Sequence, residues 1–238
     1  PADILVEKDT GTLIVADRES DPAGWGNRNG CVFRIDPTTN SVSVVASPSA
    51  FSDPVSLAWD VDGSILVVDQ TANPLQLPNS AGALFRLNPW TGSVNLVRAF
   101  TRPQFVAPSA GTAIDHGDWE GQYFVVDKDA DPNERGTRPG GVFRVPRDGG
   151  APVFFGDAQG FAEPIDVLMG VRDDLLVMDK LALTENTPLG IGAVFRFRLA
   201  DGALMQNPWG SNSFRALSGF LQLAGAEVDS STVRWIDE

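Results

Sequence analysis

Four short phrases recur at fixed spacing and limit the fold more than any other feature of the chain. An apolar stretch that ends in Asp occurs at residues 12–17, 64–69, 122–127 and 174–179, and a Phe-Arg pair follows each stretch. The distance from that Asp to that Arg is 17 residues in every copy. Repeats on this scale predict a protein built as an array of similar structural units.

Each repeat predicts four short β-strands. The stretch that ends in Asp is apolar at nearly every position, which indicates a strand buried on both faces. Another strand precedes it, as in PVSLAWDVDG, and a last strand follows Phe-Arg, as in SVNLVRAF. Asp-Pro-Thr-Thr-Asn, Asn-Pro-Trp-Thr-Gly and Arg-Asp-Gly-Gly join the third strand to the fourth with residues typical of hairpin turns. Four-stranded antiparallel sheets that cover one another by radial stacking predict an all-β propeller.

A longer period groups the repeats in pairs. The strand-end aspartates lie 52, 58, 52 and 58 residues apart, so the pattern repeats every 110 residues. These aspartates are Asp17, Asp69, Asp127, Asp179 and Asp237. We predict a single domain over residues 1–238, with blades at about 1–50, 51–106, 107–160 and 161–217 and half of a fifth blade at 218–238.

These motifs resemble a known group of structural repeats. The pattern Pro-x-x-(apolar)-x-x-Asp-x-x-Gly-x-(apolar)-(apolar)-Val-x-Asp, followed by Gly-x-(apolar)-Phe-Arg-(apolar)-Asp-Pro-x-Thr, is similar to NHL-type propeller repeats. It is also similar to the senescence-marker-protein and gluconolactonase superfamily, especially its exported bacterial versions. The resemblance covers essentially the whole chain and implies that the first strand of each blade lines a central channel. Four and a half blades depart from the complete rings of that family.

The constant spacing also predicts structural pairs between the strand-end Asp and the motif Arg. Four charged pairs are expected, which would be partly buried and could be bidentate. They are Asp17 with Arg34, Asp69 with Arg86, Asp127 with Arg144, and Asp179 with Arg196. The alternative is a ring of arginines that captures an anionic ligand. Equal recurrence in every blade favours the structural interpretation, because functional sites usually break the symmetry that cores preserve.

The loops after the second strand of the odd blades contain candidate calcium ligands. Asp127, Asp129, Asp131 and Asn133 alternate as oxygen ligands do in many calcium loops, and Asp17, Glu19 and Asp21 do so more weakly. Ca²⁺ takes six to eight oxygen ligands, and it removes the repulsion between closely spaced carboxylates. The other interpretation of these residues is a solvated acidic loop, since short acidic motifs match loosely.

Catalytic groups are sparse. His116 is the only histidine, so a site built on two histidines is excluded. The segment AIDHGDW places it beside Asp115, Asp118 and Trp119, where it could act as a general base or simply belong to a turn. A gluconolactonase-like cation site would need carboxylates at the channel. Glu7, Asp60, Asp115 and Asp166 are first-strand candidates, but their positions in the repeats do not correspond.

The composition of the chain limits the classes of binding partner and the cellular location that we predict. Lys and Arg total 18 against 31 Asp and Glu, which gives a net charge of −13 and argues against nucleic acid. No apolar run is long enough for a membrane helix. The chain begins with Pro1 rather than Met, so a leader could have been removed, and we predict an extracellular or periplasmic location. Cys31 is alone and is expected to be buried.

Two functional classes follow. The first is a non-enzymatic exported propeller that serves as a binding platform or a building block of an extracellular assembly. The second is a calcium-dependent lactonase or similar hydrolase. A cation with an open coordination position in the channel would favour the second, and a plugged channel the first. The strand VRWID before Glu238 would carry unpaired backbone groups, which predicts a homo-oligomer or filament through terminal edge strands.

Overall fold

The structure is a computed structural model, and it describes most of the chain up to residue 205. The described residues are 1–22, 24, 26, 29–46, 50–132, 136, 139–156, 161–170, 173–182 and 192–205. Two predicted features, the half blade at 218–238 and the calcium ligand Asn133, lie outside these residues. In the described parts, no helix is long and apolar enough to cross a membrane.

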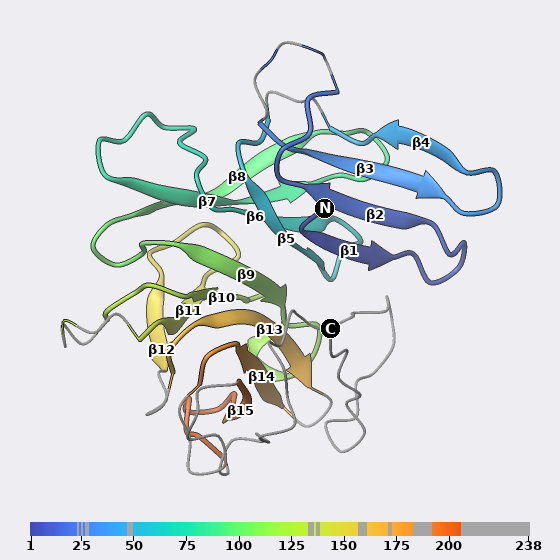
Figure 1. The fold of residues 1–238 in the computed structure, drawn as a ribbon. Coiled ribbons are helices and arrows are strands. Elements are labelled where there is room, and N and C mark those ends of the chain that lie inside the picture. Colours follow the sequence, from blue (N-terminus) through green and yellow to red (C-terminus); the bar gives the residue numbers. More distant parts are fainter. Residues whose placement is uncertain are drawn as a thin grey trace.

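The described chain forms four antiparallel sheets, which we call blades 1 to 4 (Figure 1). Blade 1 contains β1 (Asp3–Val6), β2 (Leu13–Asp17), β3 (Cys31–Asp36) and β4 (Ser41–Val44). Blade 2 contains β5 (Pro54–Trp59), β6 (Ile65–Asp69), β7 (Ser80–Leu87) and β8 (Val94–Thr101). Blade 3 contains β9 (Pro108–Ala113), β10 (Tyr123–Asp127), β11 (Gly141–Val145) and β12 (Val153–Gly156). Blade 4 contains β13 (Pro164–Gly170), β14 (Asp174–Asp179) and β15 (Ala193–Arg198).

Strand order within each blade follows the chain, because each strand returns beside the previous one through a short turn or a loop. In blade 4, Leu204 bridges Phe197 where the other blades have their fourth strand. One short 3₁₀ helix, η1 (Gly117–Trp119), lies between β9 and β10. The predicted four-strand repeat therefore corresponds closely to the observed sheets.

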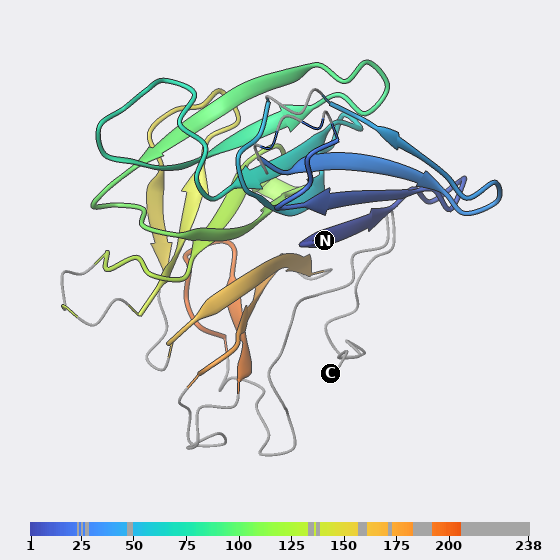
Figure 2. The ribbon, with the colours of Figure 1, turned by 45° about the horizontal axis from the view of Figure 1, so that its top comes forward.

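Three apolar layers join the blades in sequence, one layer between each neighbouring pair. Leu5, Ile14 and Val32 of blade 1 pack against Leu57, Ile65, Val67 and Phe85 of blade 2. Equivalent layers lie between blades 2 and 3 and between blades 3 and 4. The first strands lie together near the axis, with β5 beside β1 and β9 beside both β5 and β13 (Figures 1 and 2). Both faces of β6 and β10, which lie between two such layers, are thereby buried, and this explains their continuous apolar sequence.

The hairpin between third and fourth strands also touches the preceding blade. Gly92, Gly149 and Gly202 occupy this turn in blades 2, 3 and 4 with φ between +70° and +80°. A Cβ at any of them would fall well inside van der Waals contact with a backbone carbonyl of the preceding blade, at Val45, Val97 and Phe155 respectively. Glycine therefore serves both the left-handed turn and the close approach of two blades.

Candidate functional site

The recurring strand-end aspartates fasten the start of their own blades. Asp127 Oδ2 accepts the backbone N–H groups of Val106 (2.7 Å) and Ala107 (2.9 Å), which lead into β9. Its Oδ1 accepts the N–H of Asp129 at 2.9 Å. Asp69 and Asp179 make the same bonds, to residues 52 and 53 and to residues 162 and 163. Each of these three carboxylates thus ties the first strand of a blade to the end of its second strand.

Burial raises the pKa of these aspartates against the opposing effect of their N–H donors. The Asp69, Asp127 and Asp179 side chains are fully buried. The pKa values of Asp69 and Asp127 lie above the ordinary range, and that of Asp179 is raised to about 6. In blade 1, partial burial also acts on Asp17, but the Glu19 N–H and the Pro1 ammonium, 3.3 Å away, outweigh it and lower its pKa.

The predicted Asp–Arg pairs are wrong. Arg34 lies opposite Ile14 in the β2–β3 ladder, and Asp17 lies three positions farther along β2. Because side chains alternate between faces, an odd offset places the Asp and the Arg on opposite faces of the sheet. The same register separates Asp69 from Arg86, Asp127 from Arg144, and Asp179 from Arg196. The constant spacing therefore reflects strand and loop length rather than contact.

Each motif arginine instead contacts the turn between the first two strands of its blade or, in blade 4, the first residue after that turn. Arg34 Nη2 contacts Glu7 Oε1 at 2.8 Å, and Arg196 pairs with Asp174. The Arg144 guanidinium lies 4.4 Å from the ring centroid of Trp119. Arg86 binds Asp62 and also Asp60, which is buried and accepts the Tyr123 hydroxyl at 2.8 Å. The motif arginines therefore contact residues of their own blades, and their partners differ from blade to blade.

The acidic loops of the odd blades form matching turns. Asp21 Oδ2 accepts the Gly26 N–H at 2.6 Å, and Asp131 Oδ2 accepts the Gly136 N–H at 2.5 Å, one 110-residue period later. Both glycines have positive φ. Over the described residues, no three His, Cys, Asp or Glu side chains are grouped to hold a metal ion. Calcium binding by Asp127, Asp129, Asp131 and Asn133, or by Asp17, Glu19 and Asp21, stays a prediction.

His116 lies at the surface between two carboxylates. Its Nδ1 is 2.6 Å from Asp115 Oδ1, and its Nε2 is 3.7 Å from Asp173 Oδ1 in the neighbouring blade. The imidazole is 45% exposed, and both aspartates are more exposed still. This arrangement connects the turns of blades 3 and 4.

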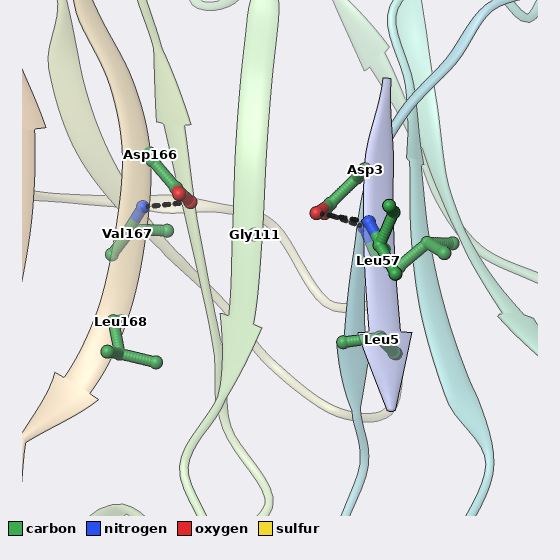
Figure 3. Close-up of a pocket in the computed structure, with 8 residues that line it drawn as sticks. Asp3, Leu5, Leu57, Gly111, Asp166, Val167 and Leu168 are labelled. Carbon is green, nitrogen blue, oxygen red and sulfur yellow. Dashed lines mark hydrogen bonds between the residues drawn. The ribbon is translucent and has the colours of Figure 1, made fainter. Parts of the chain in front are cut away.

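The axis contains a small polar hollow that the sequence analysis missed. Its lining comes from all four first strands: Asp3, Ile4, Leu5, Leu57, Gly111, Asp166, Val167 and Leu168. Figure 3 shows the carboxylates of Asp3 and Asp166 pointing toward one another from β1 and β13, with Gly111 of β9 between them. A Cβ at Gly111 would lie 2.8 Å from Val68 Cγ2, so glycine allows β9 to approach blade 2 closely.

Register shows why these side chains meet. Asp3, Ser56, Ala110 and Asp166 each lie opposite the residue that precedes a strand-end Asp. They therefore occupy one position in four blades and form a ring of Asp, Ser, Ala and Asp. The predicted set Glu7, Asp60, Asp115 and Asp166 mixed different positions, because only Asp166 belongs to this ring. A sequence signal that could have found Asp3 is proline, because Pro1, Pro54, Pro108 and Pro164 each lie two residues before a member of the ring.

Hydrogen bonds hold this ring to the backbone. Asp3 Oδ2 accepts the N–H of Leu57 in β5 at 2.7 Å, and its Oδ1 accepts the Ile4 N–H at 2.7 Å. Ser56 also hydrogen-bonds to Asp3, and the Gly111 N–H donates to Ser56 Oγ at 3.3 Å. Burial raises the pKa of Asp3 to about 6, although these donors act against it. The network links β1, β5 and β9 across the axis.

The size of the hollow limits its chemistry. About 10 Å³ is open to the centre of a water-sized sphere. This space holds roughly one water molecule or one small ion, whereas pockets for organic ligands usually measure about 300–1,000 Å³. Leu5, Leu57 and Leu168 occupy much of the surrounding wall. Among the described residues, this hollow is therefore too small for an organic substrate.

Comparisons with known proteins identify the fold alone. No family model matches the chain, and no curated protein matches it. One similar solved structure is TolB from Acinetobacter baumannii, with a TM-score of 0.57 and 11% identity over 89% of this chain and 44% of the TolB chain. Another is a nidogen/laminin complex, with a TM-score of 0.48 and 11% identity over 92% of this chain and 82% of the other.

The sheet topology and the similarity to TolB define the class: this chain is a β-propeller. The predicted all-β propeller is therefore confirmed. The chain spans less than half of the TolB chain that it matches. Because propellers serve many unrelated functions, the fold does not select one.

Proposed function

We propose that this chain is a non-enzymatic, exported β-propeller that acts as a binding platform. One observation carries the proposal: the hollow on the axis has room for about one water-sized sphere. Lactonases and similar hydrolases need a cavity that admits their substrate, and a filled axis favours a rigid scaffold that binds through its outer surface.

The buried charges support a scaffold. Asp69, Asp127 and Asp179 accept backbone N–H groups, and Asp60 is shared between Tyr123 and Arg86. Each of these groups holds strands or blades together, which is the role expected of buried charges in a rigid scaffold. A net charge of −13 suits a positively charged partner at the surface.

Two measurements test the proposal: an assay of lactone hydrolysis and the location of the native protein in the cell. Purified protein is incubated with gluconolactone and a panel of simple lactones, with millimolar Ca²⁺ or with chelator, beside the Asp3→Asn, Asp166→Asn double variant. We expect no turnover above that variant, and recovery of the native protein outside the cell or in its envelope by fractionation. Calcium-dependent turnover that disappears in the double variant would replace this proposal with the hydrolase.

A second candidate is a building block of an extracellular assembly, either a homo-oligomer or a filament. One observation favours it: an apolar face of blade 1 has no neighbouring blade among the described residues. Ile4, Val42 and Val44 on this face are 39%, 62% and 42% exposed. Light scattering over a concentration series tests assembly, because self-association through this face would raise the mass with concentration.

A further inference from the structure

The hairpin between β7 and β8 has an exposed tryptophan where the other blades have smaller or polar residues. Trp90 lies two residues before Gly92, and it is 68% exposed, more than any other large apolar residue in the described parts of the chain. Counted back from the same turn, the corresponding residues of blades 1, 3 and 4 are Thr38, Arg147 and Ala200. Trp90 therefore breaks the symmetry of the repeat, which is typical of functional residues rather than of core residues.

The Trp90 ring lies against the turn between β5 and β6. A Cβ at Gly63 in this turn would lie 3.2 Å from Cη2 and 3.8 Å from Cζ3 of the ring. The turn itself is fixed, because the Gly63 N–H donates to the Asp60 carbonyl at 3.0 Å and the Asp60 N–H donates to the Ser64 carbonyl at 2.8 Å. The Trp90 N–H donates to Asn88 Oδ1 at 3.0 Å. The backbone thus supports the six-membered part of the indole, while most of the residue stays accessible.

An ionised carboxylate lies next to this support. Asp62, which precedes Gly63, accepts hydrogen bonds from Arg86 at Oδ2, and Arg147 Nη2 lies 3.0 Å from the same oxygen. Its Oδ1 accepts the Ser64 hydroxyl at 2.6 Å and the Ser64 N–H at 3.0 Å. Desolvation raises the pKa of Asp62, but the Ser64 hydrogen bonds and the Arg86 guanidinium outweigh it and lower the value to about 2. The carboxylate is therefore charged at neutral pH and held in one orientation.

The two arginines are held from the other side by a buried carboxylate. Asp60 Oδ2 lies 3.0 Å from Arg86 Nε and 3.3 Å from Arg147 Nη2, and it accepts the Tyr123 hydroxyl at 2.8 Å. The side chains of Arg86 and Arg147 are 29% and 32% exposed, and that of Asp62 is 44% exposed. The formal charges of two arginines and two aspartates cancel. The surface beside Trp90 thus offers fixed donors and acceptors without net charge.

We propose that Trp90, Asp62, Arg86 and Arg147 form a binding site for a neutral carbohydrate, which we call the Trp90 site. One face of a pyranose ring carries C–H groups and matches an exposed indole, whose large apolar body favours such contacts. A sugar hydroxyl both donates and accepts, so neighbouring hydroxyls can bind the carboxylate and a guanidinium at once. A charged ligand is less suited, because it would be attracted by one sign of charge here and repelled by the other. The inference rests on the proposed binding function and names the class of ligand.

Electrophoresis in native gels that contain a neutral polysaccharide tests this site. The gels contain dextran, galactomannan, xylan or mixed-linkage β-glucan, and we expect at least one of them to retard the native protein. Trp90→Ala should weaken this binding by about tenfold or more, as truncation of an aromatic anchor usually does, and Trp90→Phe should keep part of it. Asp62→Asn should weaken it by about three- to tenfold through loss of a charged acceptor.

The matched control is Leu75→Ala. Leu75 is also an exposed apolar residue of blade 2, at 58%, but it lies in the loop between β6 and β7 at the opposite end of the strands. This variant should be retarded as much as the native protein. Melting curves of all variants show that each is folded, which we expect because the replaced side chains are exposed.

Two results would overturn the proposal. Native protein that none of the four polysaccharides retards does not bind neutral carbohydrate, and equal retardation of the native protein and Trp90→Ala places the sugar elsewhere. Immobilised polylysine gives a separate measurement of the binding platform. Protein that binds polylysine but no polysaccharide would retain the platform for a basic partner and remove the carbohydrate site. Failure of the proposed function itself is distinct, since it is measured as calcium-dependent lactone turnover.

Discussion

At the scale of single residues, the two recurring charges of the repeat have separate tasks. Asp127 fixes the segment that leads into β9, and Arg144 lies on the Trp119 ring. The spacing of these residues was visible in the sequence, but their partners were not. Val106 and Ala107 bind through backbone N–H groups, which any residue supplies, so no side-chain pattern marked the contact.

A double-mutant cycle tests this separation. We expect Asp127→Asn to lower the free energy of unfolding by ~1–3 kcal/mol, because buried N–H groups lose a charged acceptor. We expect Arg144→Leu to cost about 0.5–1 kcal/mol, the usual size of a partly exposed cation–π contact. Urea unfolding of both single variants and the double variant should show additive losses. A coupling of 1 kcal/mol or more, on the order expected for a direct pair, would restore the predicted Asp–Arg contact.

Asp179 gives the fold a dependence on pH. Its folded pKa of about 6 lies above the ordinary value of 3.8, so the folded state binds its proton more tightly. Its contribution to stability is therefore complete below pH ~4 and disappears as the pH rises through ~6. Between pH ~7.5 and ~4.5 we expect Asp179 to add about 2 kcal/mol, since one pKa unit corresponds to about 1.4 kcal/mol.

The measurement is the urea midpoint at both pH values for wild type and Asp179→Asn. The variant should lose this share of the stabilisation on acidification. Asp201→Asn is the control, because Asp201 is exposed and Arg198 lowers its pKa, so it stays ionised across this range. An identical pH response in wild type and Asp179→Asn would show that the buried carboxylate does not titrate there.

At the scale of elements, the strands could be predicted far better than the way they meet. Residues 64–69 are apolar throughout and form β6, which is buried on both faces. Turn residues such as Asp148 and Gly149 marked the hairpins correctly. Asp3 was missed because its place in the axial ring depends on register with β2, and the loops between first and second strands differ in length. Contacts between blades depend on such registers.

The hairpin glycines test how blades meet. Gly149 and Gly11 both have positive φ, at +80° and +69°, but only Gly149 lies against another blade. Gly11→Ala should cost about 1–2 kcal/mol, from the left-handed backbone alone. Gly149→Ala should cost a further ~1–3 kcal/mol, because its Cβ meets the Val97 carbonyl. If chemical unfolding showed that Gly11→Ala and Gly149→Ala lower the free energy of unfolding equally, the two blades would be able to move apart at this turn without an energetic cost.

At the scale of the whole molecule, a net charge of −13 favours the binding of cations. Calcium is the cation for which the sequence predicts specific ligands. We expect Ca²⁺ to raise the melting temperature, since an ion that binds only the folded protein stabilises it. Asp129→Asn with Asp131→Asn should abolish the rise, whereas Asp148→Asn with Asp201→Asn should preserve it. Melting curves that are the same with chelator and with millimolar Ca²⁺ would exclude the loop site.

The apolar layers between blades predict a further property of the entire ring. Phe143 is 1% exposed and contacts Phe105 and Phe154, so Phe143→Ala should cost ~3–5 kcal/mol through lost burial and an unfilled cavity. Phe33 holds the same position in blade 1, on the face that has no neighbouring blade among the described residues. Phe33 is half-buried, so at low protein concentration we expect Phe33→Ala to cost less than Phe143→Ala. If a second copy covers this face, the loss for Phe33→Ala should grow with protein concentration, because association stabilises the folded protein by mass action. A loss that stays constant over the concentration series would contradict assembly through Phe33.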